Sequence, residues 1–178
     1  MAMNQVKMVV TGPFSSGKTE FISSISEIDV VKTERTISSE AEREVKSQTT
    51  VAMDFGRITI TDDIVLYLFG TPGQERFSFM WETLSEGMLG FVLLVDATSP
   101  QSVEDARSMI EFFKGMAEVP FVVAANKVDA EDAEALDLVR TDLGLDASVP
   151  LLPVDARDRE SVKAVLIGLL NEILKSMD

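Results

Sequence analysis

The stretch Gly12-Pro13-Phe14-Ser15-Ser16-Gly17-Lys18-Thr19 determines how the rest of this sequence is interpreted. It fits the pattern G-x-x-x-x-G-K-[ST], and it stands between an apolar run at 5–10 and a helix-like stretch that begins at Lys18. The two glycines allow the backbone to curl, so that successive N–H groups face phosphate oxygens at the amino end of a helix. The sequence therefore predicts a phosphate-binding loop. In such a loop we expect Lys18 to reach the β- and γ-phosphates of a nucleotide and Thr19 to ligate Mg²⁺.

Composition narrows the classes of protein to which the chain can belong. Its 178 residues are enough for one globular domain, so we expect a single domain over 1–178. The net charge of −14 opposes binding to nucleic acid and to anionic membranes. With no Cys and no His, the chain has no thiol nucleophile, no disulfide and no imidazole base. The apolar runs are too short to cross a bilayer and no lipidation pattern is present, so we expect a cytoplasmic protein without a direct membrane anchor.

Strand-like and helix-like patterns alternate along the chain. Strands are predicted at 5–10, 51–60, 64–69, 89–96, 120–126 and 149–154, and helices at 18–28, 101–116, 131–143 and 159–177. The turn at 61–63 is too short for a crossover helix, so the strands on either side of it must pair antiparallel. The polar residues 32–48 are expected to form a loop, or a short helix from Ser38. The pattern predicts a three-layer α/β fold, with a six-stranded, mainly parallel sheet that has one antiparallel strand and helices on both faces.

A second polar motif, Asn126-Lys127-Val128-Asp129, follows the predicted strand at 120–126. Because the carboxyl ends of parallel strands meet at one edge of a sheet, we expect this motif to lie beside the phosphate loop. The carboxylate of Asp129 can accept hydrogen bonds from guanine N1–H and from the exocyclic amine, whereas adenine has no donor at N1. The stem of Lys127 can lie against the base. The motif therefore favours a guanine nucleotide, and it conflicts with a P-loop ATPase or kinase.

With these motifs the chain resembles the Ras-like small GTPases of the P-loop GTPase superfamily. The motifs follow in the family's order over nearly the whole chain: 12–19, Thr50, 71–77 and 126–129. The stretch Gly73-Gln74-Glu75-Arg76-Phe77 is similar to Rab and Arf sequences, and the cysteine-free chain resembles the prokaryotic members, the MglA kind among them. The resemblance implies the small G-protein version of the P-loop NTPase fold and a GTP/GDP switch that hydrolyses GTP slowly. The alternative is a guanine-nucleotide-binding adaptor with negligible hydrolysis.

The resemblance also implies roles for individual residues. Thr50 would bind Mg²⁺ and sense the γ-phosphate, Gly73 would donate its N–H to that phosphate, and Gln74 would orient the attacking water. Asp155-Ala156-Arg157 is similar to the family's weakest motif, in which the N–H of Ala156 would meet guanine O6. The expected nucleotide-binding residues are Gly12, Phe14, Ser15, Ser16, Gly17, Lys18, Thr19, Glu20, Asn126, Lys127, Asp129, Asp155, Ala156 and Arg157; the expected catalytic residues are Gln74, Lys18, Thr50 and Gly73, and the expected metal ligands are Thr19 and Thr50.

Two positions within the motifs depart from the family pattern. Gly70 stands where most members have an Asp that holds a Mg²⁺-bound water. Either the affinity for Mg²⁺ suffers, or Asp62, Asp63 or another nearby acid compensates, or Mg²⁺ is held well enough by Thr19, Thr50, phosphates and waters. Phe14 stands where the family most often has Gly. It would either crowd the γ-phosphate and slow hydrolysis, or pack beneath the loop as part of the core.

The two segments expected to sense the nucleotide, switch I and switch II, also differ from the pattern. The interval from Lys18 to Thr50 exceeds the usual one by roughly a dozen residues, which predicts an enlarged switch I. It contains Arg35 and Arg43, which are either catalytic arginines or solvated charges. Because no aromatic residue lies between Phe21 and Phe55, Val30 or Val31 would have to contact the guanine.

Switch II is unusually apolar, with Phe77, Phe79, Met80 and Trp81 in one short stretch. These side chains would either form an exposed surface for a partner, or Phe77 and Trp81 would pack inside and leave only Phe79 exposed. By the resemblance, protein effectors and regulators, with a roadblock-fold protein among the candidates, would bind through switch I and switch II.

Overall fold

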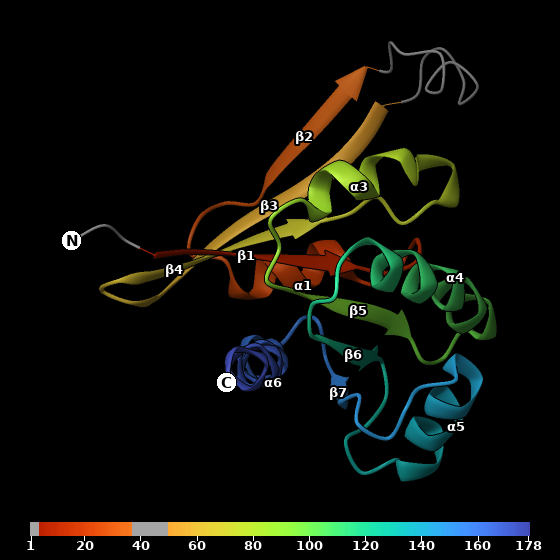
Figure 1. The fold of residues 1–178 in the computed structure, drawn as a ribbon. Coiled ribbons are helices and arrows are strands. Elements are labelled where there is room, and N and C mark those ends of the chain that lie inside the picture. The colour runs from red at the N-terminus through yellow and green to blue at the C-terminus, as the bar shows by residue number, and fades with distance from the viewer. Residues whose placement is uncertain (1–3, 37–49) are drawn as a thin grey trace.

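The computed structural model describes residues 4–36 and 50–178, with side chains described for 4–30 and 53–178. One seven-stranded sheet runs in the order β2-β3-β4-β1-β5-β6-β7 (Figure 1). The strands are β1 (Asn4–Thr11), β2 (Val31–Thr36), β3 (Thr50–Thr61), β4 (Ile64–Gly70), β5 (Gly90–Asp96), β6 (Phe121–Asn126) and β7 (Leu151–Val154). The helices are α1 (Lys18–Ile25), the 3₁₀ helix η1 (Glu75–Phe77), α3 (Phe79–Ser85), α4 (Pro100–Met116), α5 (Ala133–Leu143) and α6 (Arg159–Met177).

The pairing of the strands confirms the predicted α/β fold with a mixed, mainly parallel sheet. Strand β3 pairs antiparallel with both of its neighbours, β2 and β4, and the pairs from β4 through β1, β5 and β6 to β7 are all parallel. The antiparallel β3–β4 pair is the one expected from the short turn between them.

The sheet has one strand more than predicted, because part of the expected loop at 32–48 forms the edge strand β2. An edge strand pairs on one side only, and VKTERT has no apolar run or alternation that would mark a half-buried strand. The prediction of a loop is therefore wrong for residues 32–36. The rest of that segment, with Arg43 and the helix expected from Ser38, lies outside the described residues.

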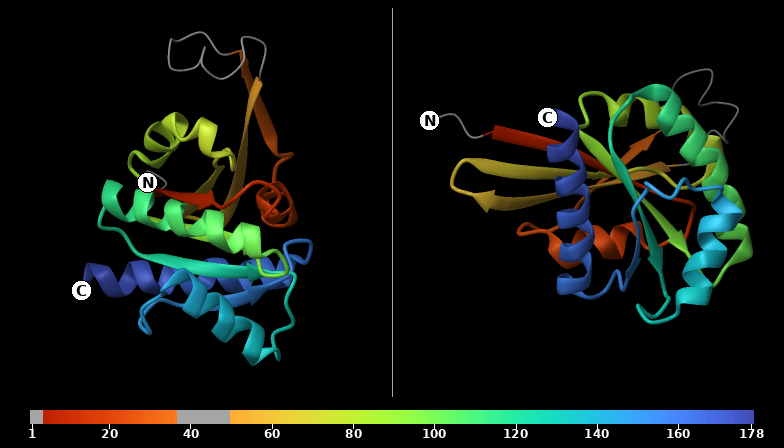
Figure 2. Two further views of the ribbon diagram at one scale, coloured as in Figure 1. Left: turned by 90° about the vertical axis from the view of Figure 1, so that its right-hand side faces the viewer. Right: turned by 60° about the horizontal axis from the view of Figure 1, so that its bottom comes forward.

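The helices cover both faces of the sheet and enclose two separate cores (Figure 2). Helices α1 and α6 pack on one face, and α3, α4 and α5 pack on the other. Strand β5 is covered on both faces and is therefore apolar along its length. Its side chains alternate between the two cores: Val92 and Leu94 contribute to the first, and Phe91, Leu93 and Val95 to the second. A strand covered on both faces has no polar side to show in its sequence.

The ends of several helices follow from capping groups. Helix α5 begins two residues later than predicted, because the carboxylate of Asp132 accepts a hydrogen bond from Ala135 N at 3.0 Å. Helix α6 begins at Arg159 as predicted, with Asp158 as its cap. Helix α1 ends at Ile25, three residues before the predicted end, where Ser26 turns to an extended conformation. In the described part of the chain, no helix combines the length and the apolarity needed to cross a membrane.

Strand β1 lies between β4 and β5 and is parallel to both. The direction in which the chain adds strands reverses at this point, and ligands of open α/β sheets bind outside the carboxyl ends of the strands at such a reversal. The loop after β1 and the segments after β4, β6 and β7 all leave the sheet at this edge. The fold therefore brings together motifs that are far apart in the sequence.

Candidate functional site

The loop between β1 and α1 is held tightly against neighbouring strands. A Cβ atom at Gly12 would lie 2.1 Å from the carbonyl oxygen of Leu94 in β5. At Gly17, which has a φ of +106°, a Cβ atom would lie 2.6 Å from Asn126 Nδ2. Glycine is thus required at both positions, where the backbone approaches β5 and the end of β6. This is the curled, glycine-dependent loop that the sequence predicted.

Lys18 is buried within this loop and only 9% exposed. Its Nζ donates hydrogen bonds to the carbonyl oxygens of Gly12 at 2.6 Å and Pro13 at 2.7 Å. Burial lowers the pKa of Lys18 to about 7, although the carboxylate of Asp54 opposes this shift. Because an anion nearby would stabilise the charged ammonium, this environment suits a phosphate ligand.

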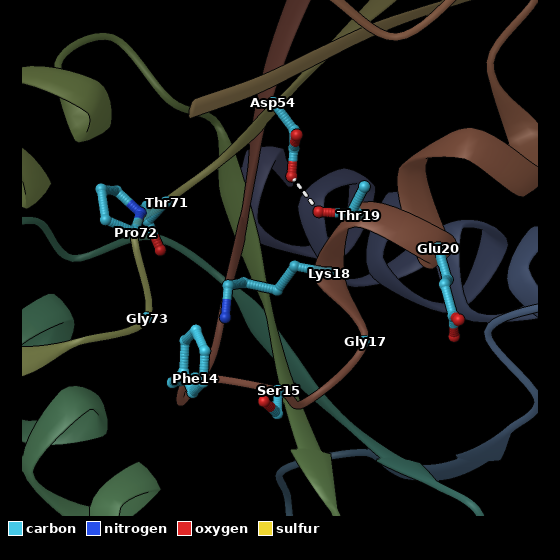
Figure 3. Close-up of a pocket in the computed structure, with 10 residues that line it drawn as sticks. All are labelled: Phe14, Ser15, Gly17, Lys18, Thr19, Glu20, Asp54, Thr71, Pro72 and Gly73. Carbon is cyan, nitrogen blue, oxygen red and sulfur yellow. Dashed lines mark hydrogen bonds between the residues drawn. The ribbon is translucent and has the colours of Figure 1, made fainter. Parts of the chain in front are cut away.

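A cavity of about 410 Å³ opens beside the loop, within the size range of small-molecule sites (Figure 3). Gly73 reaches it from the segment after β4, so close that a Cβ atom there would lie 2.5 Å from Phe14 N and 2.6 Å from Lys18 Nζ. Phe14 is 67% exposed, so the hypothesis that it packs beneath the loop is wrong. The cavity is lined by Phe14, Ser15, Gly17, Lys18, Thr19, Glu20, Asp54, Thr71, Pro72 and Gly73.

A second cavity, of about 380 Å³, lies at the ends of β6 and β7 and shares Glu20 with the first. Asn126 links the phosphate loop to the segment after β7. Its Nδ2 donates to the carbonyl oxygen of Ser16 at 3.0 Å, and its Oδ1 accepts from Ala156 N at 3.2 Å. The cavity is lined by Glu20, Asn126, Lys127, Val128, Asp129, Val154, Asp155 and Arg157. The structure therefore brings the predicted base-binding residues together next to the phosphate loop.

Lys127 is fixed by an acid that the sequence analysis did not identify. Its backbone has a φ of +65°, and its Nζ lies 2.8 Å from Asp96 Oδ2 at the end of β5. Burial opposes ionisation of Asp96, but hydrogen bonds from Lys127 and Thr98 outweigh it and hold the pKa of Asp96 below its usual value. The signal that could have identified Asp96 is its place as the last residue of a buried strand at the same sheet edge.

Asp155, which lines the second cavity, is also paired with a neighbouring side chain. Arg157 Nε lies 3.2 Å from Asp155 Oδ1, and both side chains are largely exposed. Hydrogen bonds from Arg157 hold the pKa of Asp155 below its usual value.

The segment after Gly73 packs inside the protein rather than presenting an apolar surface. Trp81 is 3% exposed, its Nε1 donates to the carbonyl oxygen of Pro72 at 2.8 Å, and its ring stacks on Phe113 with centroids 5.7 Å apart. Phe77 and Met80 are buried as well. The hypothesis of an exposed apolar switch II is therefore wrong. Phe77 and Trp81 pack inside as the second alternative predicted, but Phe79 is half-buried against Phe77 and Met80 rather than exposed. Gln74 follows Gly73, and its Oε1 accepts a hydrogen bond from Arg76 Nε.

Switch I is described only in part. Thr50 is the first residue of β3, and Asp54 is four positions further along, which is about 13 Å in an extended strand. Arg35 lies in β2 opposite Val51. The roles proposed for Thr50 and Arg35 stay predictions. Val30 packs against the core formed with α1 and α6.

Asp54 is a residue of the first cavity that sequence reasoning missed. Its Oδ2 accepts a hydrogen bond of 2.6 Å from Thr19 Oγ1 (Figure 3). Asp62 and Asp63, the acids named from the sequence, lie in the turn before β4, about 23 to 26 Å from Gly70 along the strand. They therefore cannot compensate for the glycine. Hydroxyl and carboxylate oxygens such as those of Thr19 and Asp54 are the kinds of ligand that Mg²⁺ prefers, so the donor set fits this ion.

Comparison with known proteins agrees with this geometry. A family described as conserved hypothetical ATP binding proteins matches residues 28–175. An uncharacterized protein of Methanocaldococcus jannaschii, MJ1339, is 31% identical over 138 residues, which cover 78% of this chain and 80% of that protein. The chain belongs to the family described as conserved hypothetical ATP binding proteins.

Similar proteins that carry assigned names include Ras and Rab proteins. The Ras-related protein Rab-8A of Rattus norvegicus is 28% identical over 72% of this chain, which spans 65% of the Rab-8A length. The Ras-like protein rasB of Dictyostelium discoideum is 31% identical over 65% of this chain and 61% of its own length. This family member is thus a P-loop NTPase related to the Ras and Rab small GTPases, and the finer MglA-like assignment stays a prediction.

Proposed function

We propose that this P-loop NTPase is a guanine-nucleotide switch, which binds GTP or GDP with Mg²⁺ and slowly hydrolyses GTP to GDP and phosphate. The observation that carries the proposal is the position of Asp129. It lines the cavity next to the phosphate loop, together with Asn126 and Lys127. A carboxylate at this place can accept both N–H donors of guanine, whereas adenine offers it none at N1.

The residues of the first cavity account for the expected handling of the phosphates. The backbone N–H groups of the glycine loop would bind phosphate oxygens, and the buried ammonium of Lys18 would lie against the β- and γ-phosphates. Gly73, which packs against the loop, would donate its N–H to the γ-phosphate. Bound Mg²⁺ would neutralise charge that develops on the phosphate oxygens.

Hydrolysis itself would need little from the side chains. Gln74 follows Gly73 and would orient a water molecule for in-line attack on the γ-phosphorus, after which the bond to the β-phosphate oxygen breaks and GDP leaves. Because Arg76 already donates to the amide oxygen of Gln74, it competes with the water for this side chain, which favours a slow unaided rate. The same hydrogen bond, with the exposed Phe14 beside the cavity, supports the alternative of a nucleotide-binding adaptor that scarcely hydrolyses GTP.

The description of the family as ATP binding makes the choice of base the first thing to test. Purified protein is denatured and the released nucleotide is identified by anion-exchange chromatography. Stripped protein is then loaded with a fluorescent GDP analogue, which is displaced with GDP or ADP. We expect bound GDP, and a preference for GDP over ADP on the order of 10⁴-fold, as for a site built to hydrogen-bond one ligand.

The variant Asp129→Ala should lose most of this preference, and the exposed Glu131→Ala serves as the matched control. Equal displacement by ADP would overturn the guanine assignment. Intact GTP in the purified protein, with no phosphate released over hours, would favour the adaptor. Effectors and regulators, including a roadblock-fold protein, stay part of the proposal and would be sought with the GTP-loaded form.

A further inference from the structure

Asp54 and Gly70 are direct cross-strand partners in the antiparallel β3–β4 pair. One of them carries a carboxylate and the other has no side chain at all. Strand β4 leads from Gly70 into Thr71 and then to Gly73, which contacts the phosphate loop. The two residues therefore lie at the edge of the sheet where the first cavity opens, and in Figure 3 the side chain of Asp54 points to Thr19.

The space around Gly70 shows why these two positions depend on each other. A Cβ atom at residue 70 would lie 2.9 Å from Ile22 Cδ1, 3.1 Å from Asp54 Cβ and 3.5 Å from Asp54 Oδ2. The first two distances are shorter than ordinary contacts between carbon atoms. A side chain at position 70 would thus compete with Asp54 for the same volume. Glycine at 70 makes room for the carboxylate that enters from β3.

The contact that Asp54 makes places its charge at the proposed metal ligand. Its Oδ2 accepts a hydrogen bond of 2.6 Å from the hydroxyl group of Thr19, and Thr19 is the residue after Lys18 in the phosphate loop motif. The other acid that lines the first cavity is Glu20, which extends away from Thr19 in Figure 3 and also lines the second cavity. Asp54 is therefore the acid whose contacts can orient the Thr19 hydroxyl.

We propose that Asp54 supplies the carboxylate of the Mg²⁺ site, transferred across the strand pair from position 70 to position 54. Asp54 would act as a positioning residue, which orients the Thr19 oxygen and accepts a hydrogen bond from a water of the metal ion. Mg²⁺ usually keeps several of its waters in protein sites, and carboxylates that hold such ligands tune the affinity for the metal. This inference rests on the proposed nucleotide function.

The test measures how the retention of nucleotide depends on Mg²⁺. Full-length protein is loaded with a fluorescent GDP analogue, and the rate of its release is recorded over a titration of Mg²⁺. In Asp54→Asn the amide oxygen can still accept the Thr19 hydrogen bond, but the charge is gone. We expect the Mg²⁺ concentration for half-maximal retention to rise between 10-fold and 100-fold. Asp63→Asn, in the exposed turn between β3 and β4, is the control and should leave it unchanged.

Substitutions that move the carboxylate from position 54 to position 70 of β4 distinguish a role of Asp54 at the metal from a merely structural role. All of these variants are made with Ile22→Val, which removes the Cδ1 atom that a Cβ at residue 70 would meet at 2.9 Å. In that background, retention in Asp54→Gly should require more Mg²⁺, and Gly70→Asp should weaken retention because its side chain collides with Asp54. The variant that carries both changes should recover most of the midpoint of Ile22→Val. An unchanged midpoint in Asp54→Asn, or no recovery when both changes are combined with Ile22→Val, would overturn the inference.

The titration also separates this inference from the proposed function. If wild-type protein retains an ADP analogue instead of the GDP analogue, the guanine assignment fails, and the same titration with the ADP analogue still tests Asp54. If it retains neither nucleotide, both proposals fail. If it retains GDP with a Mg²⁺ midpoint that Asp54→Asn does not move, only the role of Asp54 is lost.

Discussion

Nucleotide binding should draw a proton from solution at pH 8, because Lys18 is largely neutral before the ligand arrives. Burial lowers the pKa of Lys18 to about 7. At pH 8 only about one molecule in ten then carries the charged ammonium. A phosphate group beside Nζ favours the charged form. We therefore expect the uptake of about 0.9 proton per nucleotide at pH 8, about 0.5 at pH 7 and close to one at pH 9.

Isothermal titration calorimetry can count these protons. Binding of GDP is measured at one pH in buffers with different ionisation enthalpies, and the slope of the observed heat against the ionisation enthalpy gives the number of protons taken up. Lys18→Arg keeps a positive charge that does not titrate in this range, so the slope should fall to near zero. Lys163→Arg changes an exposed lysine of α6 and should keep the wild-type slope.

The dependence on pH in the wild-type protein provides a second check if Lys18→Arg does not bind. The terminal phosphate is largely ionised above pH 7, so Lys18 should dominate the change in uptake between pH 7 and pH 9. A binding heat at pH 8 that is the same in every buffer would refute the reasoning, since it would mean that Lys18 is already charged in the free protein.

Three further predictions concern the nucleotide-free fold. The pKa of Lys18 in the folded protein lies below its ordinary 10.5, so the unfolded chain binds more protons than the folded one between pH 7 and 10.5. In urea denaturation, the free energy of unfolding should therefore rise with pH over this range, by up to about 1.4 kcal/mol per pH unit. The variant Lys18→Met should remove this contribution. Trp81→Phe should lower the free energy of unfolding by about 1 kcal/mol in the same assay, because the hydrogen bond to Pro72 is lost; an unchanged value would argue against that bond. Gly115→Ala should raise the free energy of unfolding by about 0.5–1 kcal/mol, because the space around the new methyl group in α4 is open. Gly17→Ala should instead unfold at a lower temperature than the wild type, because the backbone at this position has a φ of +106°. A melting curve in which Gly17→Ala matches the wild type would contradict this.

Much of the site could be predicted from short stretches of sequence. The spacing of Gly12, Gly17 and Lys18 specifies a local backbone conformation between a strand and a helix, and the structure contains that conformation. The polar residues after the strand that ends at Asn126 also lie where the rule for parallel strands places them. In the first case a short pattern specifies the loop, and in the second the rule for parallel strands gives its place, so a pattern in the sequence is enough.

The features that the sequence did not reveal depend on residues far apart in the chain. The burial of Trp81 depends on α4, which supplies Phe113 as its stacking partner. The polar strand β2 is stabilised by backbone pairing with β3, which leaves no periodic pattern of apolar side chains.

The chain by itself thus determined a phosphate loop, a mixed sheet covered on both faces and a base-binding motif at its edge. Only the tertiary structure determined which acid meets Thr19. The register of β3 against β4 places Asp54 opposite Gly70, and an antiparallel register is set by pairing between strands rather than by either strand alone. The sequence therefore showed a carboxylate missing at position 70, and the strand pairing showed that one enters the same space from position 54.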